Sequence, residues 1–189
     1  TLGLMIIIGT IPIGIAGIGL KHVIEGRLTK NLWVIAGSLI GLALILTLAE
    51  WIGSKRRGVA ELRVSDAVIV GVSQVFALVP GSSRSGTTIT GGLFAGLTRE
   101  AAARFSFLLS IPAVAASGLL ELPKALAVVQ GNRAALIIAT IVSAIFGYAS
   151  IAFLLRYLQT HTTLSFVIYR IALGALLLFL LASGRVGAY

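Results

Sequence analysis

The chain has 189 residues, of which 58% are hydrophobic and 11% charged, and its mean hydropathy is +1.05. Soluble domains carry about 25% charged residues and could not bury this much apolar surface at this size, so the composition indicates an all-α integral membrane protein. The formal net charge of +9 does not predict nucleic-acid binding, because the basic residues lie in short gaps between apolar runs, and the absence of cysteine excludes disulfides and thiol chemistry.

Five segments are long and apolar enough to cross a membrane, which takes about 20 residues in a helix. They are residues 2–20, 32–53, 101–120, 134–155 and 164–183. The polar gaps between them are too short for a second domain, so we expect a single membrane domain. The first residue is Thr1 and the only methionine, Met5, lies inside an apolar run, so we expect a longer natural chain.

Residues 66–97 form a different kind of segment. The first apolar part ends at Val79, which gives a helix of about 21 Å at 1.5 Å per residue, too short to cross. Pro80 and the polar run that ends at Gly86 follow, and then a second half-length apolar stretch. Irregular backbone survives at membrane depth only inside protein or beside water. We therefore predict a re-entrant helix hairpin with a functional tip.

A faint internal repeat has an offset of 133 residues. Gly14, Thr29 and Gly41, for example, recur as Gly147, Thr162 and Gly174. The repeat makes residues 9–53 and 142–186 equivalent and predicts an inverted-repeat helical bundle. The partner of the re-entrant hairpin would then precede Thr1.

The tip has the composition of an anion site. Pro80 stops the first half-helix, Gly81 and Gly86 allow close approach of the backbone, and Ser85, Thr87 or Thr88 can cap the second half-helix. Amides at a helix N-terminus attract phosphate, Arg84 adds a planar charged fork, and the hydroxyls of Ser82, Ser83 and Ser85 add neutral donors. The alternative is that Arg84 pairs with a structural carboxylate or caps a carbonyl in a transporter gate.

Several polar residues outside the tip carry two interpretations. Arg104, near one end of an apolar segment, could face the same cavity as Arg84 or extend to the membrane interface. Arg170 lies deeper in its segment and could pair internally. Gln74 and Ser106 could contact substrate or form ordinary polar contacts between helices.

Two motifs together carry a resemblance to a known family. They are PGSSRSG, residues 80–86, and RFSFLLSIP, residues 104–112, with Gly71, Gln74, Ala77, Thr88, Gly91 and Gly92 around them. This pattern closely resembles the undecaprenyl-diphosphate phosphatase family, also known as the bacitracin-resistance family, and the resemblance extends along the whole chain.

The resemblance implies a multi-pass enzyme of the bacterial inner membrane with two interlocked inverted repeats. Such an enzyme hydrolyses undecaprenyl diphosphate to undecaprenyl phosphate and inorganic phosphate, recycles the lipid carrier for peptidoglycan synthesis and confers bacitracin resistance. Its partners would be this substrate and the bilayer, and the sequence leaves a homodimer open. The implied catalytic residues are Arg84, Ser83, Ser85 and Thr88, and the implied substrate-binding residues are Pro80, Gly81, Ser82, Gly86, Thr87, Gln74 and Arg104.

The chain departs from the family in one respect. The glutamate-rich motif of the family, which supplies acid–base and metal-binding groups, is absent, and Ser73 and Ala77 occupy the repeat-equivalent positions of its two glutamates. We expect no metal ligands in this chain, with Mg²⁺ or Ca²⁺ bound by glutamates before Thr1, and we expect this piece alone to be inactive. The alternative function is a transporter or flippase that binds an anionic lipid headgroup without hydrolysis.

Overall fold

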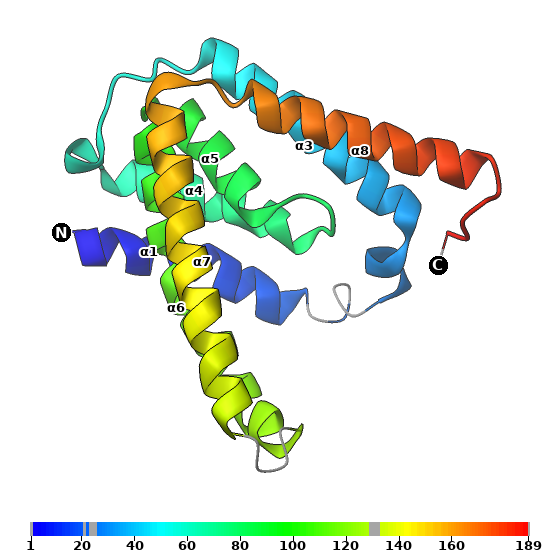
Figure 1. The fold of residues 1–189 in the computed structure, drawn as a ribbon. Helices are drawn as coiled ribbons and strands as arrows, with labels where there is room; N and C mark the ends of the chain where they lie inside the picture. The colour runs from blue at the N-terminus through cyan, green and yellow to red at the C-terminus, as the bar shows by residue number, and fades with distance from the viewer. Residues whose placement is uncertain (1, 21, 23–25, 129–132, 189) are drawn as a thin grey trace.

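The computed structural model describes residues 2–20, 22, 26–128 and 133–188, and every regular element in that part of the chain is a helix. Five helices are long and apolar enough to cross a membrane: α1 (Leu2–Gly19), α3 (Leu32–Ile52), α6 (Arg99–Val128), α7 (Arg133–Thr160) and α8 (Leu164–Ala182). Two shorter helices, α4 (Val64–Val75) and α5 (Arg84–Phe94), and three 3₁₀ turns complete the fold (Figure 1). The predicted all-α polytopic membrane fold is confirmed.

Two of the long helices extend beyond the predicted segments. Helix α6 continues past residue 120 to Val128, although Pro112 and Pro123 lie inside it, and α7 continues past residue 155 to Thr160. The polar residues after Leu120 suggested a loop, but the exposed Glu121–Lys124 pair forms along the helix surface at a spacing of three residues. Such a pair stabilises a helix rather than ending it.

Residues 64–94 form a helix, a break and a second helix, as predicted. The 3₁₀ turn Phe76–Leu78 follows α4, the chain reverses between Val79 and Ser83, and α5 runs back beside α4 (Figure 1). Helix α4 packs on α1 and α5 packs on α3 and α6, so the hairpin lies between long helices on both sides. At the α1–α4 contact a Cβ on Gly71 would lie 3.0 Å from the Gly9 Cα, so only small residues fit there.

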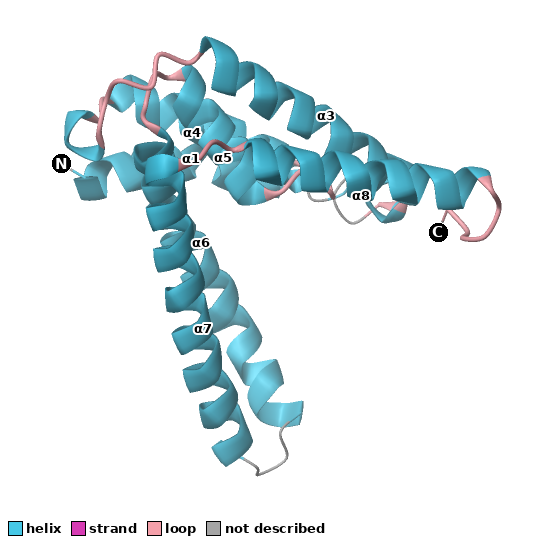
Figure 2. Ribbon diagram, turned by 45° about the horizontal axis from the view of Figure 1, so that its top comes forward, coloured by secondary structure: helices cyan, strands magenta, loops and turns pink. Residues whose placement is uncertain are grey.

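Helices α3 and α8, which the 133-residue repeat makes equivalent, lie side by side (Figures 1 and 2). They run antiparallel, because the amide of Leu32 at the start of α3 donates to Ala188 beyond the end of α8, while Thr163 before α8 donates to Glu50 near the end of α3. An inverted repeat requires this arrangement of equivalent helices. The two helices pack closely at Gly174, where a Cβ would lie 2.6 Å from the side chain of Ile40.

Both roots of the α4–α5 hairpin are bound to one loop. The Arg57 guanidinium donates to the two carboxylate oxygens of Asp66 in the first turn of α4, at 2.6 and 2.8 Å, and also to the carbonyl of Ala95 at the end of α5. The amide of Thr98 donates to the Arg57 carbonyl. The hydrogen bond to Asp66 raises the pKa of the Arg57 guanidinium above its ordinary value, so the pair stays ionised.

A second polar junction joins three long helices at the same side of the bundle. The Glu50 carboxylate near the end of α3 accepts hydrogen bonds from Arg99 at the start of α6 and from Thr163 before α8. Lys55 donates to the Glu50 carbonyl. Together with Arg57, this junction holds the hairpin roots against the ends of α3, α6 and α8.

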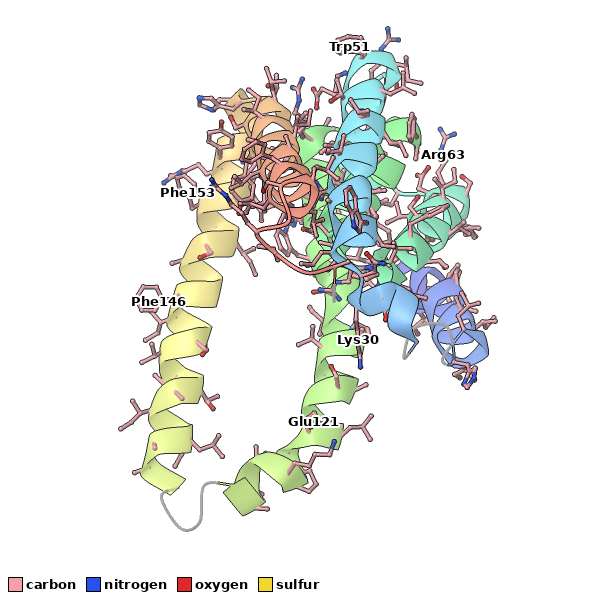
Figure 3. The ribbon with its side chains drawn as sticks, turned by 90° about the vertical axis from the view of Figure 1, so that its right-hand side faces the viewer. Lys30, Trp51, Arg63, Glu121, Phe146 and Phe153 are labelled. Carbon is pink, nitrogen blue, oxygen red and sulfur yellow. The ribbon has the colours of Figure 1, made fainter. Side chains whose placement is uncertain are left out.

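Helices α6 and α7 project from the bundle as a pair (Figure 2). Phe146 and Phe153 on α7 point away from the other helices and are 69% and 70% exposed (Figure 3). In a membrane protein such apolar faces contact lipid or other protein. The hairpin, which packs on α1, α3 and α6, lies in the compact part of the bundle and not between the projecting ends of α6 and α7.

The Arg57–Asp66 pair predicts a large effect for a single truncation at the hairpin root. Asp66→Ala should lower the free energy of unfolding by about 3 kcal/mol, because it leaves a guanidinium without its anion. Denaturant titration of the full-length protein in mixed micelles measures this. Glu121→Gln, which breaks an exposed pair, is the control and should change stability by less than about 1 kcal/mol. Equal effects of the two variants would contradict the assignment.

Candidate functional site

The tip of the hairpin presses against α3. Gly81 has φ of +85°, in the left-handed region, and a Cβ there would lie 2.6 Å from the carbonyl oxygen of Ile35. Both the backbone conformation and the space therefore require glycine. Pro80 directly before it has no amide to donate, so the chain turns without leaving an unpaired donor at this position.

Ser83 is the N-cap of α5, a role that the sequence assigned to Ser85, Thr87 or Thr88. Its hydroxyl accepts a hydrogen bond from the Gly86 amide at 3.3 Å, and its carbonyl accepts one from the Thr87 amide at 3.0 Å. Ser83 has φ of +64°, which strains a residue with a side chain. Strain of this kind is concentrated at functional sites, where the surrounding structure holds the backbone in place.

Three consecutive amides at the tip have no acceptor within the described part of the chain. They belong to Ser83, Arg84 and Ser85, at the first turn of α5. Free amides at a helix start carry partial positive charge and bind anions. The hydroxyls of Ser83 and Ser85 lie 3.4 Å apart beside them. The tip therefore presents a cluster of donors without an internal acceptor.

Arg84 is half-buried, and its guanidinium forms neither an ion pair nor a hydrogen bond among the described residues. The two well-buried carboxylates of the described chain are engaged elsewhere: Asp66 binds Arg57 and Glu50 binds Arg99 at the hairpin roots. The alternative in which Arg84 pairs with a carboxylate or caps a carbonyl is therefore not found in the described chain. An unpaired guanidinium at this depth needs an anionic ligand.

The carbonyls of the tip are held from behind by two long helices. Arg170 on α8, only 8% exposed, donates to Ser82 and Gly81 at 2.9 and 3.0 Å, and Ser38 on α3 donates to Pro80. Sequence reasoning left Arg170 as an internal pairing residue and did not single out Ser38. The depth of Arg170 in an apolar segment was the one signal available for it.

A largely apolar cavity of about 250 Å³ opens beside the tip. Its polar end is formed by Ser83, Ser85, Gly86 and Arg170. Its apolar walls come from α3, α5, α7 and α8 and include Leu39, Leu46, Ile89, Leu154, Leu158 and Phe166. A ligand that fits this cavity would place a polar group at the tip and an apolar chain between the helices.

The predicted threonines lie behind the tip. Both are buried: the Thr87 hydroxyl donates to the Arg84 carbonyl at 2.9 Å, and the Thr88 hydroxyl contacts that carbonyl at 2.8 Å and the Ser106 hydroxyl at 2.6 Å. Thr88 thus joins α5 to α6 and binds the backbone of Arg84 one helical turn earlier. Its direct participation in chemistry stays a prediction.

Two further predicted residues are buried beside the hairpin. The Gln74 carboxamide and the Ser82 hydroxyl have no hydrogen-bond partner among the described residues. Buried polar groups of this kind are normally satisfied by ordered water or a ligand. They therefore remain candidates for substrate or water contacts.

Arg104 does not join the tip. It is exposed and lines a separate recess with Leu2, Met5, Val59, Ala60 and Leu62, on the side of α6 that faces α1. Its neighbours Ala103 and Phe105 are fully buried, which sets the rotation of α6 and turns Arg104 outward. Of the two alternatives for Arg104, the one outside the cavity beside the tip describes its position in the structure, and its predicted contact with substrate stays a prediction.

The residues present do not fit a divalent metal. Mg²⁺ and Ca²⁺ prefer several carboxylate oxygens, and no group of three histidine, aspartate or glutamate side chains occurs in the described part of the chain. The tip itself offers hydroxyls and a guanidinium, which repels cations. The expected Mg²⁺ or Ca²⁺ therefore has no site in the described residues.

Comparison with known proteins gives a consistent result. The family model "Bacitracin resistance protein BacA" matches residues 1–176. An undecaprenyl-diphosphatase of Chloroherpeton thalassium is 50% identical over 100% of this chain and 70% of its own length. The enzymes of the same name from Myxococcus xanthus and Syntrophobacter fumaroxidans are 52% and 51% identical over 95% of this chain and 61% and 64% of their own lengths. The chain thus spans roughly two thirds of the length of these relatives.

The fit of the tip against α3 predicts the effect of one added methyl group. Gly81→Ala should destabilise the protein by more than about 1 kcal/mol, because alanine disfavours positive φ and its Cβ would meet Ile35. Gly118→Ala on α6 is the matched control, since a Cβ there meets nothing within 4 Å. Thermal unfolding of both variants in detergent measures the difference. A Gly81 variant as stable as the Gly118 variant would show that the tip is not held against α3.

Proposed function

The chain belongs to the family of the bacitracin resistance protein BacA, and we propose that the protein containing it hydrolyses undecaprenyl diphosphate to undecaprenyl phosphate and inorganic phosphate. One observation carries the proposal: the start of α5 carries an arginine side chain without an ion pair and three adjacent amides without an acceptor among the described residues. The names of the relatives support the same substrate. The product would be the lipid carrier of peptidoglycan synthesis, and its regeneration would confer resistance to bacitracin.

In this reaction the tip binds the diphosphate and stabilises its charge. The bond between the terminal phosphorus and the bridging oxygen breaks, the attacking oxygen forms a new bond to that phosphorus, and the lipid phosphate leaves with the electron pair. Arg84 and the amides of Ser83, Arg84 and Ser85 donate to the phosphate oxygens as negative charge develops on them. Their fixed positions supply the stabilisation without rearrangement during the reaction.

The attacking group must also lose a proton, and the tip has no base for this. The residues that line its cavity include neither a carboxylate nor an imidazole. The chain therefore accounts for phosphate binding, while the proton acceptor and a Mg²⁺ or Ca²⁺ site stay predictions for residues outside the described part. We predict that this piece alone is inactive, because it binds phosphate but lacks a proton acceptor and a metal site in its described part.

The cavity beside the tip suits the isoprenoid chain of the substrate. Its apolar walls would bury the first prenyl units, while Ser83, Ser85 and Arg170, which line its polar part, lie beside the headgroup. A multi-pass membrane protein is the setting that this substrate needs, and we assign it to the bacterial inner membrane. A homodimer stays a prediction. Nothing in the geometry favours a transporter or flippase over hydrolysis.

Arg84→Ala tests the headgroup assignment. Turnover in a phosphate-release assay with the full-length protein and undecaprenyl diphosphate should fall by about 100-fold or more, because the main charged contact to the developing oxyanion is lost. Arg156→Gln on α7, an exposed arginine, should retain wild-type turnover. Binding of substrate without any turnover by the wild-type protein would instead favour the transporter. Unchanged turnover of Arg84→Ala would remove Arg84 from the mechanism.

Leu154→Trp tests the tail assignment by filling the cavity. The KM for the long-chain substrate should rise about tenfold, because one well-buried side chain contributes about 1.5–3 kcal/mol to apolar burial. Inhibition by inorganic pyrophosphate, which has no tail, should stay unchanged. Phe153→Trp is the matched control, since Phe153 is the preceding residue and points away from the bundle (Figure 3). Equal KM values for the two variants would place the tail elsewhere.

A further inference from the structure

We propose that Arg170 and Ser38 are positioning residues that hold the phosphate-binding tip in its anion-accepting orientation. This inference rests on the proposed function. It adds two residues, on helices distant in sequence from the PGSSRSG motif, to the residues that bind the phosphate. We call the pair the carbonyl clamp, because it binds three consecutive carbonyls, those of Pro80, Gly81 and Ser82.

The clamp controls which way the peptide groups of the tip face. In a trans peptide the carbonyl and the following amide point in opposite directions. Arg170 Nη1 binds the Ser82 carbonyl at 2.9 Å, so the amide of Ser83 points away from α8. That amide begins the run of three without an acceptor. Holding the Ser82 carbonyl thus orients the Ser83 amide, the first of the three, while the amides of Arg84 and Ser85 are oriented by the first turn of α5.

Each nitrogen of the Arg170 guanidinium has its own acceptor. Besides Ser82, Nη2 binds the Gly81 carbonyl at 3.0 Å and Nε contacts the Leu39 carbonyl at 3.4 Å. A planar guanidinium can bind carbonyls on two different elements at fixed angles, which a lysine ammonium cannot reproduce. The single side chain therefore ties the tip to α3 as well as to α8.

The clamp also brings a second positive charge to the tip. Arg170 forms no ion pair in the described part of the chain, and a Cβ on Gly86 would lie only 2.9 Å from its Nη1 atom. Neutral donors would satisfy the same carbonyls at a far lower desolvation cost, because a charge within a membrane protein is expensive. The charge is therefore explained by its effect on an anion beside Gly86, where Arg170 also lines the cavity.

Variants of the full-length protein separate positioning from mere stability. Arg170→Gln should lower kcat by about 100-fold, since small misplacements of a binding group have effects of that order, while Arg170→Lys should lie between it and the wild type. Ser38→Ala, which removes one bond and no charge, should lower kcat about fivefold. Both Arg170→Gln and Ser38→Ala should weaken binding of inorganic pyrophosphate, measured by calorimetry. The controls are Arg156→Gln and Thr47→Ala, of which the second removes a hydroxyl from α3 that bonds only within its own helix.

The outcomes distinguish the two proposals. If the wild type hydrolyses the lipid, but Arg170→Gln and Ser38→Ala match the controls in kcat and pyrophosphate affinity per folded molecule, the clamp is refuted and the proposed function stands. If the wild type binds pyrophosphate without hydrolysing the lipid, and the clamp variants weaken that binding, the proposed function fails and the clamp stands. Should Arg170→Gln not fold, Ser38→Ala decides alone: normal pyrophosphate affinity overturns the clamp.

Discussion

The structure depends on satisfying irregular backbone in the interior of a membrane protein. Where α4 stops and α5 begins, five residues leave the helical pattern, and their carbonyls cannot be satisfied by lipid. Ser38 and Arg170 satisfy three of them, and the helices that carry these side chains, α3 and α8, pack closely on each other at Gly174. The break in the hairpin can therefore exist only because two long helices cross behind it.

Polar groups are divided between the two ends of the hairpin. At its roots, two acids are paired with bases: Asp66 with Arg57 and Glu50 with Arg99. At its tip, Arg84 and Arg170 stand without any acid. Opposite charges stabilise the fold at the roots, whereas the unmatched positive charge at the tip is available to a ligand. The chain belongs to the family of the bacitracin resistance protein BacA, and its relatives are named undecaprenyl-diphosphatases. A positive charge at the tip without an acidic partner in the described chain is consistent with binding of an anionic group.

The sequence predicts the local features of this fold well and the contacts between distant segments poorly. The break at Pro80 and the five long helices follow from proline chemistry and hydropathy, which act within a few residues. The sequence left two positions open for Arg104 because α6 is apolar on nearly every side, so its rotation is decided by packing of Ala103 and Phe105. Arg170 binds backbone carbonyls 88 and 89 residues away. Every residue has a backbone carbonyl, so the sequence does not indicate which ones Arg170 binds.

Arg57 has one more consequence, for how the hairpin can move. Its side chain joins the start of α4 to the end of α5, so the two half-helices cannot separate or slide past each other without breaking an ionised pair. The tip is fixed as well, since Ser38 and Arg170 bind its carbonyls. With both ends of the hairpin held, a lipid would have to enter and leave by movement of the surrounding long helices, while the amides at the tip keep their arrangement.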